Sequence, residues 1–325
     1  MMNKRTNQRG AALLVVLLLA ATLSFVALAT MEKISLTAAR VGNVSERSEA
    51  LWEALAIEVL AKKAIETAFE ANNSKMSSED PWANKPIELP LDNGFARVVL
   101  DDATACFNLN SLAQSSEEDA GEKALNEFVR LASLVGVSEF EAQALGQSIA
   151  DWIDFDNQRR PQGAEDEYYT TRPSPYRTAN QVIPSVSEIR AVRGVSQEIY
   201  LALEPYVCAL ENTGPSPINV NMLERRDAPI LAAILGDDIS MQKASDIIGA
   251  RPPGGYTDVS GFLNMPAIKE LHLPNEMTSR FHITSRYLRA HAEIVYDRAV
   301  FNMTSELALD GARARIVSRR IGAEK

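Results

Sequence analysis

The sequence predicts an α+β protein in which a long N-terminal helix packs on an antiparallel β-meander and a large helical insertion interrupts the sheet. Three observations predict this fold. An uncharged run at 11–31 continues to residue 71 without a proline. Alternating apolar and polar residues indicate a strand at 95–101 and further strands through 288–321. The long segment between these strands shows helical periodicity that Gly and Pro residues interrupt.

The first element combines a short basic segment with an apolar helix. Residues Met1–Gly10 contain Lys4, Arg5 and Arg9 and no acid, and 21 uncharged residues follow at Ala11–Met31. Roughly 20 helical residues at about 1.5 Å each match a hydrocarbon core of about 30 Å. A basic flank holds this end in the cytoplasm. The sequence therefore predicts a single membrane-spanning helix with the rest of the chain on the far side.

The junction of Gly10 and Ala11 resembles the cleavage site of type IV pilins and type II secretion pseudopilins. This resemblance implies that a prepilin peptidase removes residues 1–10 and that the new N-terminus at Ala11 is methylated. Two alternatives stay open. A secretory signal peptide would be cut near Ala27-Leu28-Ala29, although the apolar run exceeds the usual 7–15 residues of a signal core. The second alternative is an uncleaved membrane anchor.

Composition limits the function of the remaining chain. Once Lys4, Arg5 and Arg9 are set aside, residues 32–325 contain 30 basic and 43 acidic side chains, a formal charge of −13. Such a charge repels nucleic acids and anionic lipids and favours a bound cation. At 325 residues the chain has room for about two domains beyond the membrane helix.

The helix continues beyond the membrane. Leu51, Leu55 and Val59 recur at helical spacing among charged neighbours, so this half packs against a globular head. A polar stop follows at 72–74. The next segment is predicted to be a loop because it contains Pro81, Pro86 and Pro90.

The strands close the predicted head domain, which comprises residues 32–105 and 281–325. One strand at 95–101 precedes the insertion, and three follow it at 288–296, 299–309 and 312–321. Asp310-Gly311 is a tight-turn signal between the last two. In the final strand three arginines are predicted to point outward: Arg313, Arg315 and Arg319.

The insertion, predicted at 106–280, contains a repeat. The segments 107–112 and 218–223 are near copies with an Asn-x-Asn core, and helical patterns follow each. Residues 241–263 are typical of a helix-hairpin-helix, and 184–207 of a looser one, so the insertion is expected to contain helix-hairpin-helix or SAM-like repeats. Seven helices are predicted there: 117–134, 139–154, 186–192, 198–203, 229–235, 241–250 and 259–263.

Three segments in order, at 151–156, 163–169 and 218–221, together with the N-terminal junction, resemble the type II secretion system protein K family. The resemblance implies a non-enzymatic minor pseudopilin in the inner membrane with its head in the periplasm. It implies a role in capping the pseudopilus tip and initiating its assembly for export of folded proteins across the outer membrane. Its implied partners are the I-type and J-type minor pseudopilins, the major pseudopilin, the prepilin peptidase, and the inner-membrane platform, secretin or cargo proteins.

Position five of the predicted mature chain is Val15. Most pilins and pseudopilins have a glutamate there, which pairs with the N-terminal amine of a neighbouring subunit. A carboxylate among apolar helices is costly unless it is paired. A subunit at the tip, with no neighbour above it, has no use for this group.

An acidic segment is the candidate metal site. Acids occupy positions 151, 154, 156, 165, 166 and 167, with only Arg159 and Arg160 as bases. Carboxylates this close repel one another unless a cation holds them. Asp154, Asp156, Glu165 and Asp166 are the predicted calcium ligands, and the resemblance favours calcium. A solvated acidic loop and a catalytic carboxylate pair are the alternatives that stay open.

The remaining chemistry is sparse. Cys106 and Cys208 form a disulfide or remain a pair of buried thiols. His272, His282 and His291 are scattered, so the sequence suggests neither a zinc site nor a catalytic triad.

A second class of function is a membrane-anchored DNA receptor that uses the predicted hairpins. Backbone N–H groups and nearby bases of such hairpins hold phosphates in nucleic-acid-binding proteins. Residues 229–274, however, contain three basic and five acidic side chains. This local charge disfavours DNA.

Overall fold

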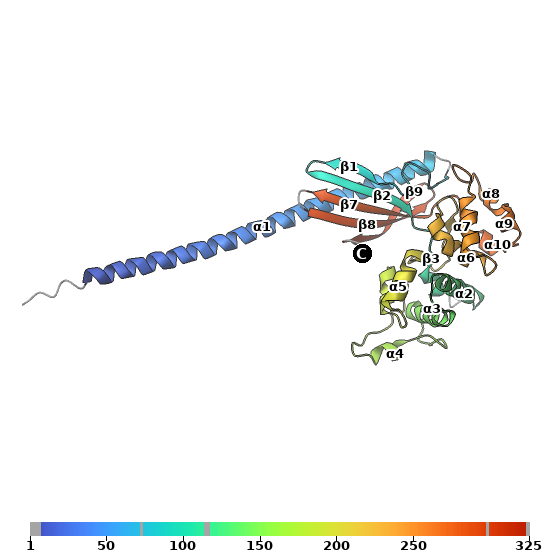
Figure 1. The fold of residues 1–325 in the computed structure, drawn as a ribbon, viewed down its shortest axis with the longest axis horizontal. Helices are drawn as coiled ribbons and strands as arrows, with labels where there is room; N and C mark the ends of the chain where they lie inside the picture. Colours follow the sequence, from blue (N-terminus) through green and yellow to red (C-terminus); the bar gives the residue numbers. More distant parts are fainter. Residues whose placement is uncertain (1–7, 72–73, 114–117, 297–298, 323–325) are drawn as a thin grey trace, which may run out of the picture.

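The computed structural model describes residues 8–71, 74–113, 118–296 and 299–322. A long helix, α1, extends away from the head, and the sheet packs on the half of α1 that lies in the head (Figure 1). The helical insertion lies to one side of the sheet, with α4 and α5 far from the axis of α1. The α+β fold class that the sequence predicts is therefore confirmed.

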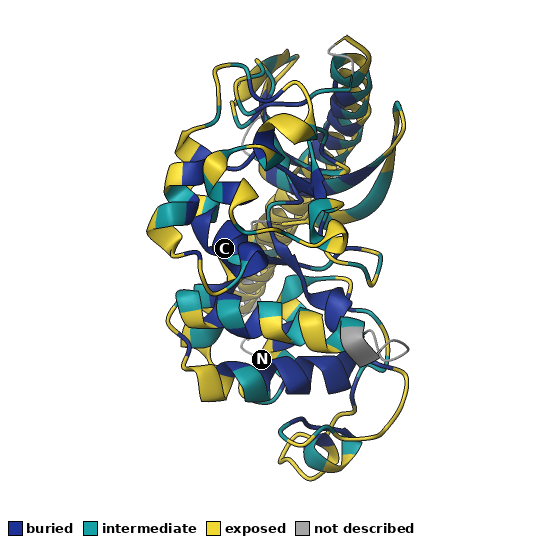
Figure 2. Ribbon diagram, turned by 90° about the vertical axis from the view of Figure 1, so that its right-hand side faces the viewer, coloured by how far each residue is buried: buried dark blue, intermediate teal, exposed yellow. Residues whose placement is uncertain are grey.

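Helix α1 runs over Gln8–Ala71, 64 residues without a proline. Its membrane-side half is exposed, whereas its other half buries one face against the sheet (Figure 2). Three alanines on that face, Ala50, Ala54 and Ala61, let the backbones of helix and sheet approach closely, and Ile57 and Ile65 fill the spaces between them. The spacing of three to four residues is amphipathic, as expected, but the predicted face is displaced: Leu51 and Leu55 are only partly buried, and Val59 is 63% exposed.

The sheet has five antiparallel strands in the order β1-β2-β7-β8-β9. Their bounds are β1 Ile87–Leu91, β2 Gly94–Asp102, β7 Tyr287–Tyr296, β8 Ala299–Asp310 and β9 Arg313–Ile321. In β7 half-buried and buried residues alternate along the whole strand. The buried set packs on α1 and forms the first hydrophobic core.

Strand β1 corrects the prediction of a loop between residues 81 and 90. Ile87–Leu91 pairs with β2 in an antiparallel register, and Pro90 lies opposite Phe95. Proline has no N–H group to donate to a neighbouring strand. Because β1 is the edge strand of the sheet, no further strand on its outer side needs that hydrogen bond. Pro90 therefore interrupts regular hydrogen bonding, but it does not make this segment a loop.

The predicted orientation of Arg319 is wrong. Glu306 of β8 pairs with Ser318 whereas the next residue, Leu307, pairs with Ile316, so Val317 is an extra residue in β9. Such a bulge reverses the alternation of the residues beyond it. The side chain of Arg319 therefore reaches α1, where it bonds to Glu58.

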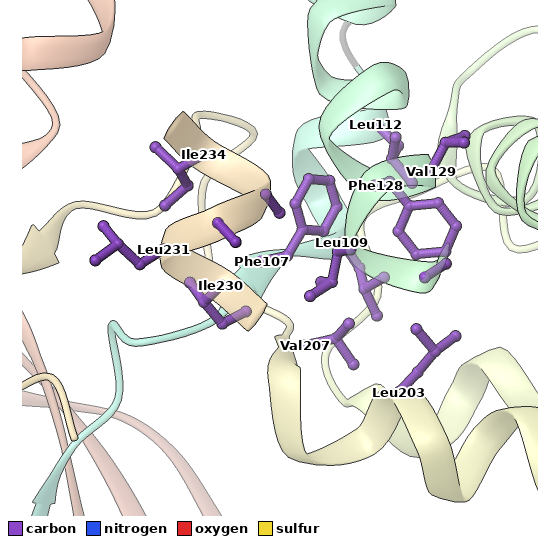
Figure 3. Close-up of a cluster of buried hydrophobic side chains, with 14 of the residues drawn as sticks. Phe107, Leu109, Leu112, Phe128, Val129, Leu203, Val207, Ile230, Leu231 and Ile234 are labelled. Carbon is purple, nitrogen blue, oxygen red and sulfur yellow. The ribbon is translucent and has the colours of Figure 1, made fainter. Parts of the chain in front are cut away.

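The insertion contains α-helices, short 3₁₀ helices and two short parallel strand pairs around a second hydrophobic core. Its α-helices are α2 Glu118–Leu134, α3 Glu139–Ile153, α4 Asp166–Thr170, α5 Gln197–Leu203, α6 Ala228–Leu235, α7 Met241–Gly249, α8 Val259–Leu263, α9 Pro266–Lys269 and α10 Asn275–Thr278. Its 3₁₀ helices are η1 Leu109–Ala113, η2 Val186–Ala191, η3 Glu204–Tyr206 and η4 Arg225–Asp227. In the core, Phe107 lies between α6 and Phe128 of α2 (Figure 3), and the two ring centroids are 5.6 Å apart.

The two Asn-x-Asn segments begin two similar halves of the insertion. β3 Phe107–Asn108 pairs in parallel with β4 Val207–Cys208, and β5 Ile218–Asn219 pairs in parallel with β6 Phe281–His282. β6 lies just beyond the predicted end of the insertion at 280, and Phe281 packs in the core of the insertion. The second asparagine of each segment is fully buried and binds the backbone of a distant loop. Asn110 bonds to both the N–H and the carbonyl of Ile183, and Asn221 does the same with Tyr256. The two copies of the repeat therefore do the same thing: each holds a distant loop in place through its second asparagine.

Candidate functional site

The predicted cleavage junction lies within α1. Gly10 and Ala11 are part of a continuous helix that begins at Gln8, and residues 1–7 of the predicted leader lie outside the described residues. Among the described residues, α1 alone has the length and apolar composition to cross a membrane. Val15 is 56% exposed near the N-terminal end of this apolar surface. Such a large exposed apolar surface is typical of contact with lipid or with other apolar helices.

The acidic segment comprises the last turn of α3, the loop that follows it and the first residue of α4; these residues, 151–166, are called the acid loop below. α3 begins at its N-cap Ser138 and ends at Ile153, so Asp154 caps its C-terminal end. The chain then turns back through Gly163. A Cβ atom at that position would overlap the carboxylate of Asp151, so only glycine permits this close approach.

Three of the four predicted ligands come together in the acid loop. One carboxylate oxygen each from Asp154, Asp156 and Glu165 lie within 4.8 Å of one another. Asp154 and Glu165 are buried, and Asp156 is the most exposed of the three. Oxygen ligands on opposite sides of a calcium ion at about 2.3–2.6 Å are separated by about 5 Å, so the spacing fits one ion.

Asp166, the fourth predicted ligand, lies outside this group. Its Oδ1 atom accepts hydrogen bonds from the N–H and the hydroxyl of Thr178, both at 2.9 Å. Its Oδ2 atom is 3.6 Å from a guanidinium nitrogen of Arg177. Asp166 therefore orders the segment that follows α4, a role that its position in the sequence does not reveal.

The group contains buried oxygen atoms without a hydrogen-bond partner. Neither carboxylate oxygen of Glu165 has one in the described structure, and neither does Oδ1 of Asp154. Burial, and then the charges of Asp151 and Asp154, raise the pKa of Glu165 to about 7. Burial also raises the pKa of Asp154, against the opposing effect of Arg160. Unpartnered carboxylate oxygens suit a hard cation such as Ca²⁺, so the residues present fit this metal.

Two further residues of the acid loop were not predicted as site residues. Asp151 is fully buried, and Arg160 donates from Nη1 to Asp151 Oδ1 at 2.7 Å and to Asp154 Oδ2 at 2.6 Å. Asp151 and Asp154 are three residues apart at the end of α3. This spacing places both side chains on one face of the helix. The position of Arg160 depends on the turn through Gly163, and no local pattern predicts it.

Cys106 and Cys208 are joined by a disulfide in the structure. Cys106 directly precedes β3 and Cys208 is the last residue of β4, and the two form a small buried cluster with Leu210. The bond connects the start of the insertion with the end of its first half.

In the predicted hairpin at 241–263, the arginine is bonded within the protein and is not presented to a ligand. The half-buried guanidinium of Arg251 donates to the carbonyl oxygens of Leu223 and Val220 at 2.6 and 3.4 Å. It also donates to the hydroxyl of Ser78 at 2.9 Å. These bonds use Arg251 to hold the hairpin to the loop before β1, so the DNA-receptor alternative is not supported.

Comparisons with known proteins match nearly the whole chain. Two family models described as type II secretion system (T2SS), protein K match residues 105–212 and 218–284, each starting at or just before one Asn-x-Asn segment. Type II secretion system protein K of Klebsiella pneumoniae is 31% identical over 324 residues, covering 99% of this chain and 98% of the relative. The protein of the same name from Pectobacterium carotovorum subsp. carotovorum is 30% identical, with 98% of each chain covered.

A solved structure is similar along most of the fold. It is a chain of the GspK-GspI-GspJ complex from the enterotoxigenic Escherichia coli type 2 secretion system, 28% identical, with a TM-score of 0.77. The match covers 88% of this chain and 100% of that one. Because the sequence matches and this structural match agree, the chain belongs to the type II secretion system protein K family.

Proposed function

We propose that this chain is the large minor pseudopilin of a type II secretion system and that it caps the tip of the pseudopilus and helps to initiate its assembly. The observation that supports capping is the shape of the head. The insertion extends to one side of α1 (Figure 1), so the head is much wider than the single helix that would join a fibre. A second copy stacked above it would meet this insertion. The chain therefore ends a fibre and does not extend it.

The proposed partners follow from the related complex. Because the solved relative is in a GspK-GspI-GspJ complex, we expect I-type and J-type minor pseudopilins beside this chain. The major pseudopilin lies below them, and the platform, the secretin or cargo proteins meet the outer surfaces. We assign the chain a structural role and no catalytic one. The pairs of short helices around Arg251 act in this view as helix-hairpin-helix or SAM-like scaffold units within the insertion at 106–280.

The proposed membrane arrangement follows from α1. Prepilin peptidase cuts after Gly10, Ala11 is methylated, and residues 11–31 hold the protein in the inner membrane with its head in the periplasm. The exposed apolar surface around Val15 supports this arrangement. Val15 also lacks the charge that would need a partner from a subunit above.

The proposed metal is one calcium ion held by Asp154, Asp156 and Glu165. The unpartnered oxygens of Asp154 and Glu165 support this site. A bound Ca²⁺ would offset the repulsion among these carboxylates and hold the acid loop against the end of α3. Its role is structural, like that of the disulfide between Cys106 and Cys208, which the oxidising periplasm would preserve.

Electron microscopy of pseudopili tests the capping role. The major pseudopilin is overproduced in cells whose only copy of this chain carries an epitope tag at its C-terminus, and gold-labelled antibody locates the tag on the fibres. We expect label at one end of each fibre and few fibres in cells that lack the chain. Label along the length of the fibres would contradict the proposal.

A further inference from the structure

The acid loop contains a cation of its own, the guanidinium of Arg160. Its Nη1 atom lies between two carboxylates, 2.7 Å from Asp151 Oδ1 and 2.6 Å from Asp154 Oδ2. The backbone N–H of Arg160 also faces both oxygens of Asp151, at 3.2 and 3.3 Å. Asp151 and Asp154 are 0% and 1% exposed. Two carboxylates with so little access to water require a positive partner within the protein.

The carboxyl group of Asp154 separates this internal cation from the proposed metal. Its Oδ2 atom is bonded to Arg160, whereas its Oδ1 atom is buried and has no hydrogen-bond partner among the described residues. One oxygen of this carboxyl group lies within 4.8 Å of oxygens of Asp156 and Glu165. The arginine therefore occupies one side of the carboxylate and leaves the other side for an ion.

We propose that Arg160 is an internal counter-cation that keeps the acid loop folded when no metal is bound. Its charge offsets those of Asp151 and Asp154, while Glu165 and Asp156 remain available to calcium. The role of Arg160 in the metal-free protein is independent of the proposed calcium site. The expectation that calcium compensates for loss of Arg160 rests on that site.

The test uses the full-length protein in detergent and compares thermal unfolding midpoints in EGTA and in CaCl₂. Arg160→Met keeps the aliphatic stem and removes the charge, and Arg160→Lys keeps a charge. We expect Arg160→Met to lower the midpoint in EGTA by roughly 5–15 °C, because a broken buried pair leaves uncompensated charge. Arg160→Lys should recover at least half of this loss. Calcium should also recover at least half of the loss in Arg160→Met.

The matched control is Arg97→Met. Arg97 also bridges two carboxylates, Glu88 at 3.0 Å and Glu293 at 3.3 Å, but its side chain is 45% exposed. Because water already solvates that cluster, we expect a shift of no more than about 2 °C, equal in EGTA and CaCl₂. An equal loss for Arg97→Met and Arg160→Met would overturn the proposal.

Other outcomes are equally decisive. No loss in EGTA for Arg160→Met, or the same loss for Arg160→Lys, would show that the charge of Arg160 is not what holds the loop. If Arg160→Met fails to fold, the double variant Asp151→Asn with Arg160→Met should fold in EGTA, because it removes one of the two buried charges. Failure of the double variant as well would overturn the proposal.

A separate measurement reports on the calcium site itself. Terbium bound at Asp154, Asp156 and Glu165 should be excited through Trp152, which lies two residues from Asp154, and Trp152→Phe should remove most of that emission. If the wild-type protein gives no such emission and calcium does not change its midpoint, the calcium site is wrong, and the comparison of Arg160→Met with Arg160→Lys in EGTA still decides the role of Arg160. If terbium binds but calcium recovers none of the loss in Arg160→Met, the expectation that calcium compensates for Arg160 is wrong.

Discussion

Glu58 of α1 and Arg319 of β9 form a bidentate ion pair, with nitrogen to oxygen distances of 2.8 and 2.5 Å, that joins the helix to the edge strand of the sheet. Glu58 is only 6% exposed and also accepts a hydrogen bond from Ser305 of β8. The pair exists because the bulge at Val317 turns Arg319 toward the helix. It connects the part of the chain that enters the membrane to the last strand of the head.

Glu58→Gln tests this link between helix and sheet. Glutamine keeps the size of the side chain and loses its charge, so we expect the free energy of unfolding to fall by about 1–3 kcal/mol. The measurement is urea unfolding of the detergent-solubilised protein. Lys63→Met is the control, since Lys63 is exposed and 3.8 Å from Glu66, and a loss below about 0.5 kcal/mol is expected there. Equal losses would mean that the pair adds nothing specific.

Glu165→Gln should have opposite effects with and without calcium. Above pH 7 the buried carboxylate of Glu165 is charged and without a hydrogen-bond partner, so its removal should stabilise the protein in EGTA by about 1–3 kcal/mol. The same change removes a proposed ligand and should abolish most of the calcium-dependent stabilisation. Glu167→Gln, on an exposed residue of the adjoining α4, should change neither value. A calcium response that survives Glu165→Gln would exclude Glu165 as a ligand.

Asp227 gives a prediction of pH dependence. Burial raises its pKa from 3.8 to about 6, while its Oδ2 atom accepts a hydrogen bond from the N–H of Glu224 at 2.8 Å. The folded state therefore binds the proton more tightly than the unfolded state, and this contribution to stability is lost as pH rises from about 4 to about 6. Asp227→Asn keeps the acceptor and removes the titration.

The difference in unfolding free energy between Asp227→Asn and wild type should thus grow by about 1–3 kcal/mol, in favour of the variant, between pH 4 and pH 7. Urea unfolding across that range measures it. Asp237→Asn is the control, because the Asp237 side chain is 86% exposed. A difference that stays constant with pH would show that Asp227 keeps its ordinary pKa.

The disulfide should stabilise the head. Cys106→Ser with Cys208→Ser should lower the free energy of unfolding by about 2–5 kcal/mol, because the bond restricts a loop of about 100 residues in the unfolded chain. Labelling of denatured protein with a maleimide, before and after reduction, reports whether the bond is present. Two labels on unreduced wild-type protein would show free thiols instead.

Gly10→Val tests the proposed processing. A peptidase that requires a small residue before the cut should leave residues 1–10 on the variant, and no pseudopili should form. Intact mass of the membrane-extracted protein distinguishes the two lengths directly. A wild-type chain that begins near Thr30 would indicate a signal peptide, and normal processing of the variant would indicate that the cut lies elsewhere.

The local elements were predictable because their causes are local. The absence of proline from residues 8–71 is enough to predict one continuous helix. Alternation was enough to predict β7 and β8 nearly to the residue. Pro90 misled the prediction of β1, because an edge strand tolerates a proline whose missing N–H group is not needed to bond a neighbouring strand.

The candidate site was predictable only in part, because its geometry depends on distant residues. Asp154, Asp156 and Glu165 belong to one acidic segment, so their proximity in the sequence is enough to predict them as ligands. The pairing of Asp166 with Thr178 and of Arg160 with Asp151 depends on how the chain folds back after α3. The bulge that turns Arg319 toward Glu58 is likewise a property of the strand pair and not of one strand.

The insertion leaves the sheet and returns to it between two neighbouring strands. Asp102 at the end of β2 pairs with Leu288 near the start of β7, and the N–H of Ala103 bonds to the carbonyl oxygen of Tyr287. In topological terms the whole insertion is the connecting loop of one β-hairpin. Closing a loop costs only about 0.6 kcal/mol more for each doubling of its length, and a folded insertion whose ends already lie together reduces even that cost. During synthesis β7, β8 and β9 emerge last, so the insertion has its own core available before the sheet can close on α1. Completion of the sheet, with Arg319 bound to Glu58, is then the step that attaches a finished head to its membrane helix.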